Sequence, residues 1–243
     1  MSREIHRWHS PNLDKDMEIV VYGHYGYGLL MFPTAGADFL EYERFKLIDS
    51  IGSFLADGKL KAFSINSINN ESWLNNYMDP AHKAIRHQQY NRYVVEEVVP
   101  FIHNHCKGLV PIITTGASLG ALHAANNFFR RPDIFSGTIA MSGSYDLKSY
   151  TKGYYDENVY FNSPVDYLPR WQDDFMFGNM RKGRIVIASG QGDFEEPDAS
   201  RQLSNILNIR GVKHWLDLWG YDQPHDWQTW RSMLPYFLGH IKF

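Results

Sequence analysis

Pro111-Ile-Ile-Thr-Thr-Gly-Ala-Ser-Leu-Gly-Ala-Leu-His-Ala-Ala125 is the stretch of sequence that decides the fold. Its first five residues are apolar or β-branched, which is typical of a central strand buried on both faces of a sheet. Its last five residues, Ala121–Ala125, include three alanines, which favour a helix that packs closely against that sheet. The pentapeptide between them has the form G-x-S-x-G, which predicts a sharp turn from strand to helix around Ser118.

The same alternation of strand and helix continues on both sides of this stretch. Helical spacing of apolar residues is found at 90–101, with a possible kink at Pro100, at 203–207, which Gly211 would end, and at 227–237. Short apolar runs predict further strands at 19–22, 28–32, 61–65, 138–142, 185–189 and 212–219. We expect the first two to be neighbours joined by a Gly-rich turn. The pattern predicts a mostly parallel α/β sheet of about seven to eight strands, with helices on both faces.

The length of 243 residues suits a single α/β domain covering residues 1–243. Only residues 147–183 lack a clear helical or strand periodicity of apolar residues. They are rich in aromatic residues and contain Pro164 and Pro169. A long segment of this kind in a compact domain is usually functional. We therefore expect a loop-rich insertion near the active site, without a large lid domain.

Composition excludes several classes of protein. The net charge of −3 gives no electrostatic reason to expect a nucleic acid or an anionic membrane as partner. Cys106 is the only cysteine, so an internal disulfide and a cysteine-rich metal site are excluded. The N-terminus lacks the apolar stretch of a secretory signal, and no run reaches the ~20 apolar residues of a membrane span. The expectation is a cytoplasmic protein whose oligomeric state the sequence does not give.

Ser118 is the predicted nucleophile. Glycines at 116 and 120 leave room for the strained turn that such a serine occupies, and the turn puts the serine at a helix N-terminus. The alternative is an ordinary Gly/Ser loop, which the strand before the motif and the small-residue helix after it disfavour.

A serine nucleophile needs a histidine base, and the base needs a carboxylate that orients it. His225 is the predicted base among 11 histidines, because it follows the last strand and precedes the last helix. Asp193, just past the strand at 185–189, is the predicted acid. Glu195 and Glu196 are rivals in the same loop, and Asp146 is the best alternative elsewhere.

The negatively charged intermediate of ester cleavage needs N–H donors. The backbone N–H of Leu119, directly after the nucleophile, is the first expected donor. The second should come from the loop after the strand at 28–32, where Pro33 has no N–H. Ala35 is preferred there, with Thr34 as the alternative.

Trp73, Tyr155 and Tyr160 are candidate substrate-binding residues, because aromatic and amide side chains are dense around them. They could equally fill apolar space between loops. We predict no metal site, since His103 and His105 form a short pair without a visible third ligand. No cofactor is expected either, because no phosphate-binding glycine loop opens a helix.

Several motifs together resemble those of the α/β-hydrolase superfamily, in particular its branch of esterases that includes esterase D, feruloyl and acetyl esterases and mycolyltransferases. The resemblance covers nearly the whole chain. Its carriers are Leu30-Met-Phe-Pro-Thr, Gly116-Ala-Ser-Leu-Gly, Ile139-Ala-Met-Ser-Gly-Ser-Tyr-Asp-Leu and His225-Asp-Trp with Trp230. It implies the α/β-hydrolase fold and a triad of Ser118, Asp193 and His225. The chain departs from the family at Pro33-Thr34, where His-Gly is common.

The expected function is hydrolysis of a small-molecule carboxylic ester, with short-chain, acetyl or aryl esters as substrates, through a covalent acyl-enzyme. An acyltransferase with the same triad and an alcohol acceptor is the alternative enzyme. A binding protein that kept the fold without catalysis is a third alternative, which the complete set of serine, acid and histidine disfavours.

Overall fold

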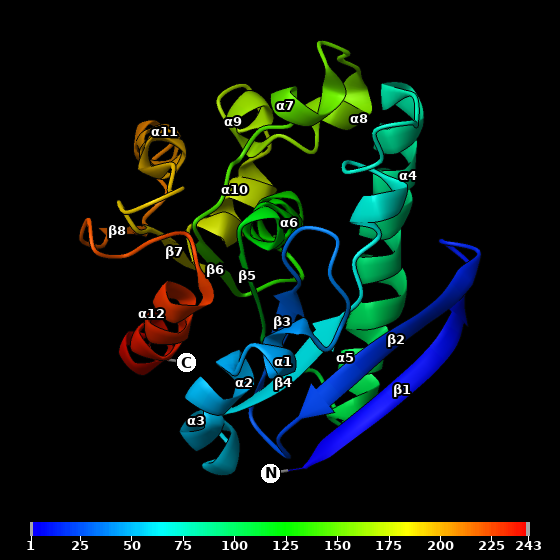
Figure 1. Cartoon of the computed structure of the whole chain (residues 1–243), viewed down its shortest axis with the longest axis vertical. Helices are drawn as coiled ribbons and strands as arrows, with labels where there is room; N and C mark the ends of the chain where they lie inside the picture. The colour runs from blue at the N-terminus through cyan, green and yellow to red at the C-terminus, as the bar shows by residue number, and fades with distance from the viewer. Residues whose placement is uncertain (1, 242–243) are drawn as a thin grey trace.

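The computed structural model of the chain describes residues 2–241, which form one twisted sheet of eight strands with helices on both faces (Figure 1). The order of strands in the sheet is β1-β2-β4-β3-β5-β6-β7-β8. Their bounds are β1 (Arg3–Ser10), β2 (Lys15–Tyr22), β3 (Tyr27–Phe32), β4 (Leu60–Ile65), β5 (Ile112–Ala117), β6 (Gly137–Met141), β7 (Arg184–Ser189) and β8 (Trp215–Leu218).

Six strands, from β4 to β8 across the sheet, run parallel, while β1 and β2 form an antiparallel pair at one edge. The prediction missed β1, because this edge strand carries mostly polar and exposed residues and so has no apolar run. The prediction that 19–22 and 28–32 are neighbours was wrong. β4 lies between them, since all of its residues are buried and therefore require a central position.

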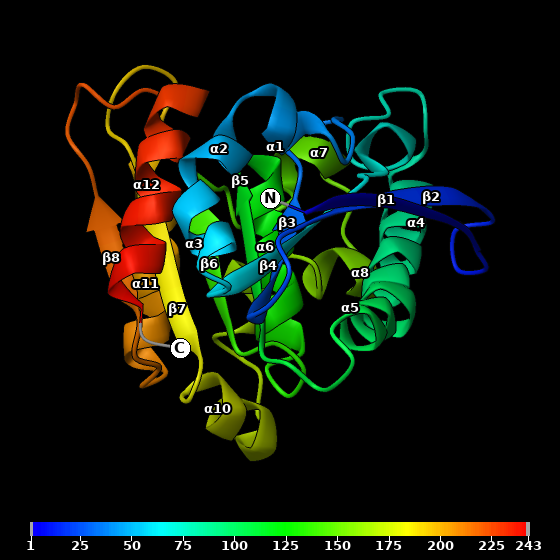
Figure 2. The same ribbon diagram turned by 90° about the horizontal axis from the view of Figure 1, so that it is seen from below.

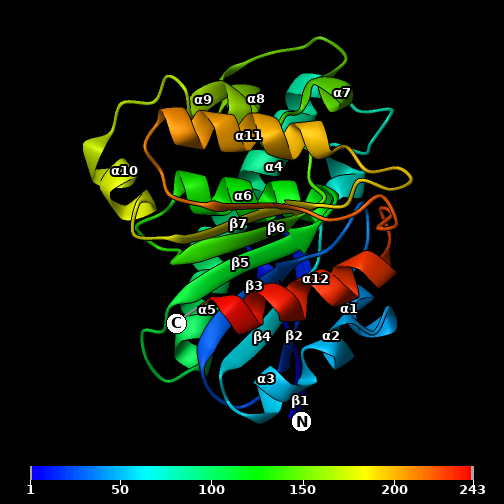
Figure 3. The ribbon, with the colours of Figure 1, turned by 90° about the vertical axis from the view of Figure 1, so that its left-hand side faces the viewer.

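The two faces of the sheet are covered by different helices (Figures 2 and 3). In β3, Leu30 and Phe32 belong to one apolar core and Leu29 and Met31 to the other, as the alternation of a strand requires. The first face carries α4 (Pro80–Tyr93), α5 (Val99–His105), α6 (Leu119–Arg130) and α11 (Pro197–Ile209). The second carries α1 (Glu41–Arg44), α2 (Leu47–Ser50), α3 (Gly52–Ala56) and α12 (Trp227–His240).

The long helix expected around 90–101 is built of α4, a π-helical turn η2 (Val94–Val98) and α5. The irregularity precedes Pro100 instead of falling on it. Proline has no N–H to donate to the carbonyl four residues earlier, here that of Glu96, and the π turn lies at that carbonyl.

The segment 147–183 contains four short helices, α7 (Lys148–Thr151), α8 (Glu157–Tyr160), α9 (Pro164–Tyr167) and α10 (Asp174–Met180). Its centre is fixed by the buried amide of Asn162, whose Oδ1 accepts hydrogen bonds from Asn91 of α4 at 2.7 Å and Asn126 of α6 at 2.9 Å. Tyr167 and Phe177 are buried in the core of the same face. Most of the segment is therefore packed structure over α6.

Within residues 2–241, none of the helices combines the length and the apolar character that crossing a bilayer would require.

Candidate active site

Ser118 lies at the turn between β5 and α6, at the edge of the sheet where the parallel strands end. Its backbone has φ +56° and ψ −127°, a strained conformation for a residue with a side chain. The flanking glycines make this turn possible. A Cβ on Gly116 would lie 2.3 Å from the carbonyl oxygen of Gly120, and one on Gly120 would lie 2.3 Å from that of Phe32 at the end of β3.

His225 lies in the loop between β8 and α12, and its ring faces Glu195. The Nδ1–H of His225 donates a hydrogen bond to Oε2 of Glu195 at 3.3 Å. The imidazole also packs edge-on against Trp230 of α12, with ring centroids 5.0 Å apart. These two contacts fix both the tautomer and the orientation of the ring, which leaves Nε2 as the atom available to accept a proton.

The carboxylate of Glu195 is fully buried and surrounded by donors. Oε1 accepts from the hydroxyl of Ser142 at 2.6 Å and from the N–H of Gly190 at 3.2 Å, and Ser189 Oγ lies 3.1 Å from Oε2. Burial alone raises the pKa of Glu195, but hydrogen bonds from His225, Ser142 and Ser189 outweigh it and hold this pKa below the usual value. Glu195 is therefore an ionised carboxylate at neutral pH.

Asp193, the predicted acid, does not face the imidazole. It is exposed, and its backbone carbonyl accepts the N–H of His225 at 2.9 Å, which ties the loop after β7 to the loop after β8. Asp146 caps a local turn, accepting from the N–H of Lys148 at 3.0 Å. Of the acidic candidates in the loop after β7, only Glu195 has a side chain that hydrogen-bonds to the ring of His225 within residues 2–241, because Phe194, with φ +64°, turns the chain inward after Asp193.

The loop after β3 lies directly beside the nucleophile turn, as the contact between Phe32 and Gly120 requires. Thr34 cannot lend its N–H to a substrate in this arrangement, because that N–H donates to Oε2 of Glu41 at 2.7 Å and its hydroxyl donates to Oε1 at 2.6 Å. Ala35 follows with φ +36°. Leu119, at the other side of the turn, is the first residue of α6, where backbone N–H groups have no partner within the helix.

Two buried polar side chains, Asn69 and His123, fix the loop after β3 through a series of hydrogen bonds. The side chain of Asn69, in the short helix η1 (Asn69–Glu71), donates from Nδ2 to the carbonyl of Ala35. Its Oδ1 accepts from Nε2–H of His123 at 2.9 Å, one turn further along α6 from Ser118. Burial lowers the pKa of His123 to about 3, so its ring is neutral and can serve as this donor. The nucleophile helix and the loop after β3 are thereby fixed to one another.

Ser118 and His225 line one small pocket with a volume of about 210 Å³. Tyr150 and Phe194 are the aromatic residues in its lining, and Phe194 is 92% exposed, an apolar side chain held at the mouth. The remaining lining residues are Leu119, Leu122, Ser142, Gly143, Ser144 and Glu196.

The aromatic residues chosen from the sequence lie elsewhere. Trp73 is buried against Leu119 and Leu122, behind the pocket wall. Tyr155 is half exposed and donates to Asp166 at 3.1 Å, and Tyr160 packs against Phe161. None of the three is in the lining of this pocket as described. Tyr150 and Phe194 carried no sequence signal except their position, within the insertion and next to the candidate acids.

The comparisons with known proteins identify the family and the fold. The model of the family described as putative esterase matches residues 54–241. Among solved structures, a ferulic acid esterase superposes with a TM-score of 0.77 at 20% identity, covering 98% of this chain and 96% of its own. S-formylglutathione hydrolase (FrmB) from Staphylococcus aureus has a TM-score of 0.71 at 15% identity, with 98% of each chain covered. MPT51 (FbpC1) from Mycobacterium tuberculosis has a TM-score of 0.70 at 16% identity, covering 99% and 98%. A search of curated protein sequences gives no match.

Proposed function

Because this chain belongs to the putative esterase family and is a serine esterase with the α/β-hydrolase fold, we propose that Ser118, His225 and Glu195 are its catalytic triad. The observation that supports this most strongly is the hydrogen bond from Nδ1 of His225 to the buried carboxylate of Glu195. The histidine lines the same pocket as Ser118, which is the predicted nucleophile. The proposal transfers the role of the acid from Asp193 to Glu195.

The chemistry that follows is acyl transfer in two steps. Nε2 of His225 removes the proton of Ser118 as Oγ attacks the ester carbonyl, and the same nitrogen then protonates the departing alcohol. Water, deprotonated by His225, cleaves the acyl-serine and releases the acid. Glu195 remains ionised throughout, so it stabilises the imidazolium that forms in both steps. Its lowered pKa suits this role, because a protonated partner would not stabilise that charge.

The oxyanion is assigned to the backbone N–H groups of Leu119 and Ala35. Leu119 is supported by its place at the first turn of α6, where free N–H groups and the helix dipole favour negative charge. Ala35 is supported by elimination. Pro33 has no N–H, and the N–H of Thr34 is engaged by Glu41. Asn69 then acts as a positioning residue, because it holds the carbonyl of Ala35.

Short acyl groups, or compact aryl ones, are the proposed substrates. A volume of about 210 Å³ is below the 300–1,000 Å³ typical of sites for larger ligands. Leu119, Leu122 and Tyr150 supply apolar walls, and Phe194 offers an aromatic surface at the mouth. We assign substrate contact to Tyr150 and Phe194 in place of Trp73, Tyr155 and Tyr160.

The test is hydrolysis of p-nitrophenyl esters from acetate to long acyl chains by the wild type and Ser118→Ala. We expect kcat/KM to be highest for the short chains and to fall at least ~10³-fold in the variant. Wild-type activity in Ser118→Ala would overturn the proposal. A preference for long chains would contradict the assigned acyl pocket alone. Adding an alcohol and measuring free acid beside new ester separates hydrolysis from acyl transfer.

A further inference from the structure

Three potential metal ligands meet at the opposite side of the molecule from Ser118. Glu4 and His6 come from β1, and His105 is the last residue of α5. One ligand atom from each lies within 4.8 Å of the other two. The sequence predicted no metal site, because His105 was paired with His103. In the fold, His103 instead accepts the N–H of Val110, while His105 faces β1 about 100 residues earlier in the chain.

The distances suit a tetrahedral ion. Oε2 of Glu4 lies 3.2 Å from Nε2 of His105 and 3.4 Å from Nε2 of His6. Ligands at the 2.0–2.2 Å typical of zinc lie about 3.3–3.6 Å apart around a tetrahedron. Two of the three distances between ligand atoms are thus already near those around a bound zinc ion. The third, between the two histidine nitrogens, is within 4.8 Å.

The surroundings hold the three groups in place. Ser2 donates from Oγ to Oε1 of Glu4 at 3.2 Å, which leaves Oε2 directed at the histidines. The ring of His6 packs edge-on against those of Phe101 and His105. Nε2 of His6 is shielded from solvent, yet it makes no hydrogen bond within the described part of the chain. Its nearest charged partner is Oε2 of Glu4 at 3.4 Å, and an ion bound between the two would give this nitrogen a ligand bond.

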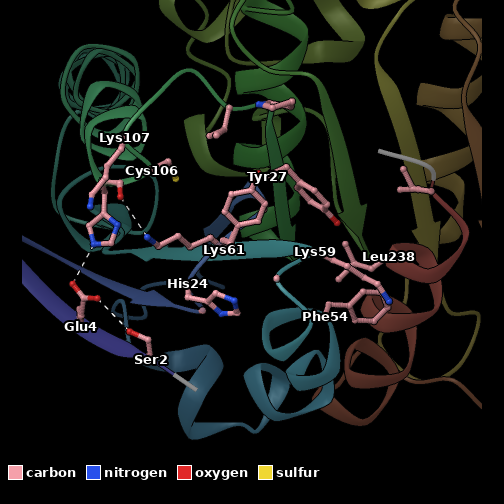
Figure 4. A pocket seen from close by; sticks show the side chains of 18 of the residues that line it. Ser2, Glu4, His24, Tyr27, Phe54, Lys59, Lys61, Cys106, Lys107 and Leu238 are labelled. Carbon is pink, nitrogen blue, oxygen red and sulfur yellow. Dashed lines mark hydrogen bonds and ion pairs between the residues drawn. The ribbon is translucent and has the colours of Figure 1, made fainter.

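Glu4 and His105 also line a large cavity of about 1360 Å³ at the amino ends of the parallel strands. Figure 4 shows Glu4 and Ser2 at one end of this cavity, with the buried Lys61 beside them. Lys61 donates to the carbonyl of His105 at 3.4 Å. Its charge opposes a cation nearby, so the affinity should be lower than that of a closed four-ligand site.

We propose that Glu4, His6 and His105 form a binding site for a zinc-type divalent ion, with the fourth position open to water or a small ligand in the cavity. Two imidazoles and one carboxylate are a ligand set that zinc uses in open sites. Bound there, the ion would join the edge strand β1 to the end of α5. This site is separate from the proposed esterase triad, so ester hydrolysis should not depend on it.

The test is titration of the chelator-treated full chain with zinc chloride, followed by calorimetry and thermal unfolding. We expect one zinc per chain, a rise in Tm with zinc concentration, and absorption typical of tetrahedral coordination when cobalt(II) replaces zinc. His6→Gln and His105→Gln should each weaken binding by at least ~100-fold, since losing even an outer-shell partner costs about 10–100-fold.

His24→Gln is the matched control, because His24 lines the same cavity outside the ligand group, and it should bind zinc as the wild type does. Glu4→Gln provides a second test at an exposed position, where the substitution does not disturb the core. The proposal is overturned if the wild type takes up no stoichiometric zinc. It is equally overturned if Glu4→Gln and His6→Gln bind as tightly as the wild type, or if His24→Gln loses as much affinity as they do.

Discussion

Two buried glutamates, Glu195 and Glu41, lie near the nucleophile turn. They have the same side chain, but their surroundings shift its pKa in opposite directions. Glu195 is buried beside His225 and accepts from several donors, and its pKa is lowered. Glu41 is buried at the start of α1, where it accepts two hydrogen bonds from Thr34. Burial raises the pKa of Glu41, and the hydrogen bonds from Thr34 only reduce that rise.

The difference shows that burial alone does not identify a catalytic carboxylate. What distinguishes Glu195 is the partner: a histidine that lines the pocket of Ser118. Glu41 holds a backbone N–H instead, and so shapes the loop from which the oxyanion donor comes. We infer that Glu195 acts on the charge of the reaction and Glu41 on the geometry around it.

The largest effect should come from replacing the two glutamates in turn. Glu195→Gln removes the charge that stabilises the imidazolium and favours the wrong tautomer of His225. We expect kcat for p-nitrophenyl acetate to fall by roughly 10³–10⁴-fold, comparable to the loss of the triad aspartate in serine proteases. Glu41→Gln keeps one acceptor for Thr34, and kcat should fall less than about 10-fold. Equal losses in the two variants would erase the distinction between them.

The loop that Glu41 holds from one side is held by Asn69 from the other. Asn69→Ala frees the carbonyl of Ala35, so the adjacent N–H can move away from the oxyanion. A displacement of about 1 Å can cost on the order of 100-fold, and we expect kcat to fall about 10- to 100-fold with KM nearly unchanged. Asn70, whose Nδ2 donates to the carbonyl of Gly36 at 3.2 Å, is the matched control. If Asn70→Ala costs as much kcat as Asn69→Ala, the assignment of Ala35 fails.

Thr34→Val tests whether the hydrogen bond between Thr34 and Glu41 contributes to stability and not to catalysis. The substitution removes the hydroxyl that donates to Oε1 of Glu41 and keeps the shape and the backbone N–H. Hydrogen bonds to charged groups contribute about 1.5–3 kcal/mol, so the free energy of unfolding in urea should fall by about that amount. The value of kcat should change less than about 3-fold. A large loss of kcat with full stability would show that Thr34 takes part in the reaction.

The smallest effect is expected in the pH dependence of stability. The contributions of the two glutamates to the free energy of unfolding should change with pH in opposite directions. The lowered pKa of Glu195 stabilises the fold above its unfolded value near 4.5, and this contribution is lost as pH falls through the folded pKa. The raised pKa of Glu41 means that ionising this side chain destabilises the fold. Its contribution to the free energy of unfolding therefore declines as pH rises from about 4.5 through the folded pKa.

Urea unfolding between about pH 3 and pH 7 measures both. The stability lost in Glu195→Gln should shrink as pH falls, whereas the stability lost in Glu41→Gln should shrink as pH rises. If the stability lost changed with pH in the same direction in both variants, the environments described for these carboxylates would be contradicted.

Most of the fold could be predicted from the sequence, because buried parallel strands are apolar on both faces and leave a strong signal. β5, β6 and β7 lie within two residues of their predicted places. β1 left no such signal, since an edge strand is stabilised by backbone hydrogen bonds to β2 more than by burial. The order of β2, β4 and β3 was also not readable, because strand pairing depends on contacts distant in sequence.

In the candidate site, Ser118 and His225 were recognisable from their neighbours in the chain, and their catalytic roles remain a proposal. The acid was harder to assign, because Asp193, Glu195 and Glu196 lie within four residues. Which of them turns inward depends on the positive φ of Phe194 and on two donors, Ser142 just after β6 and Ser189 at the end of β7. The proposed ligands Glu4, His6 and His105 meet only through the position of the unpredicted β1.

The most direct test of the proposed triad is the rate at which a fluorophosphonate labels Ser118, read by mass spectrometry of the peptide that contains it. Labelling requires the serine to be activated by His225, and it does not depend on the substrate chosen. We predict rapid labelling of Ser118 in the wild type and in Asp193→Asn, and labelling at least ~100-fold slower in Glu195→Gln. Slow labelling in Asp193→Asn with the wild-type rate in Glu195→Gln, or labelling of a different residue, would contradict the account.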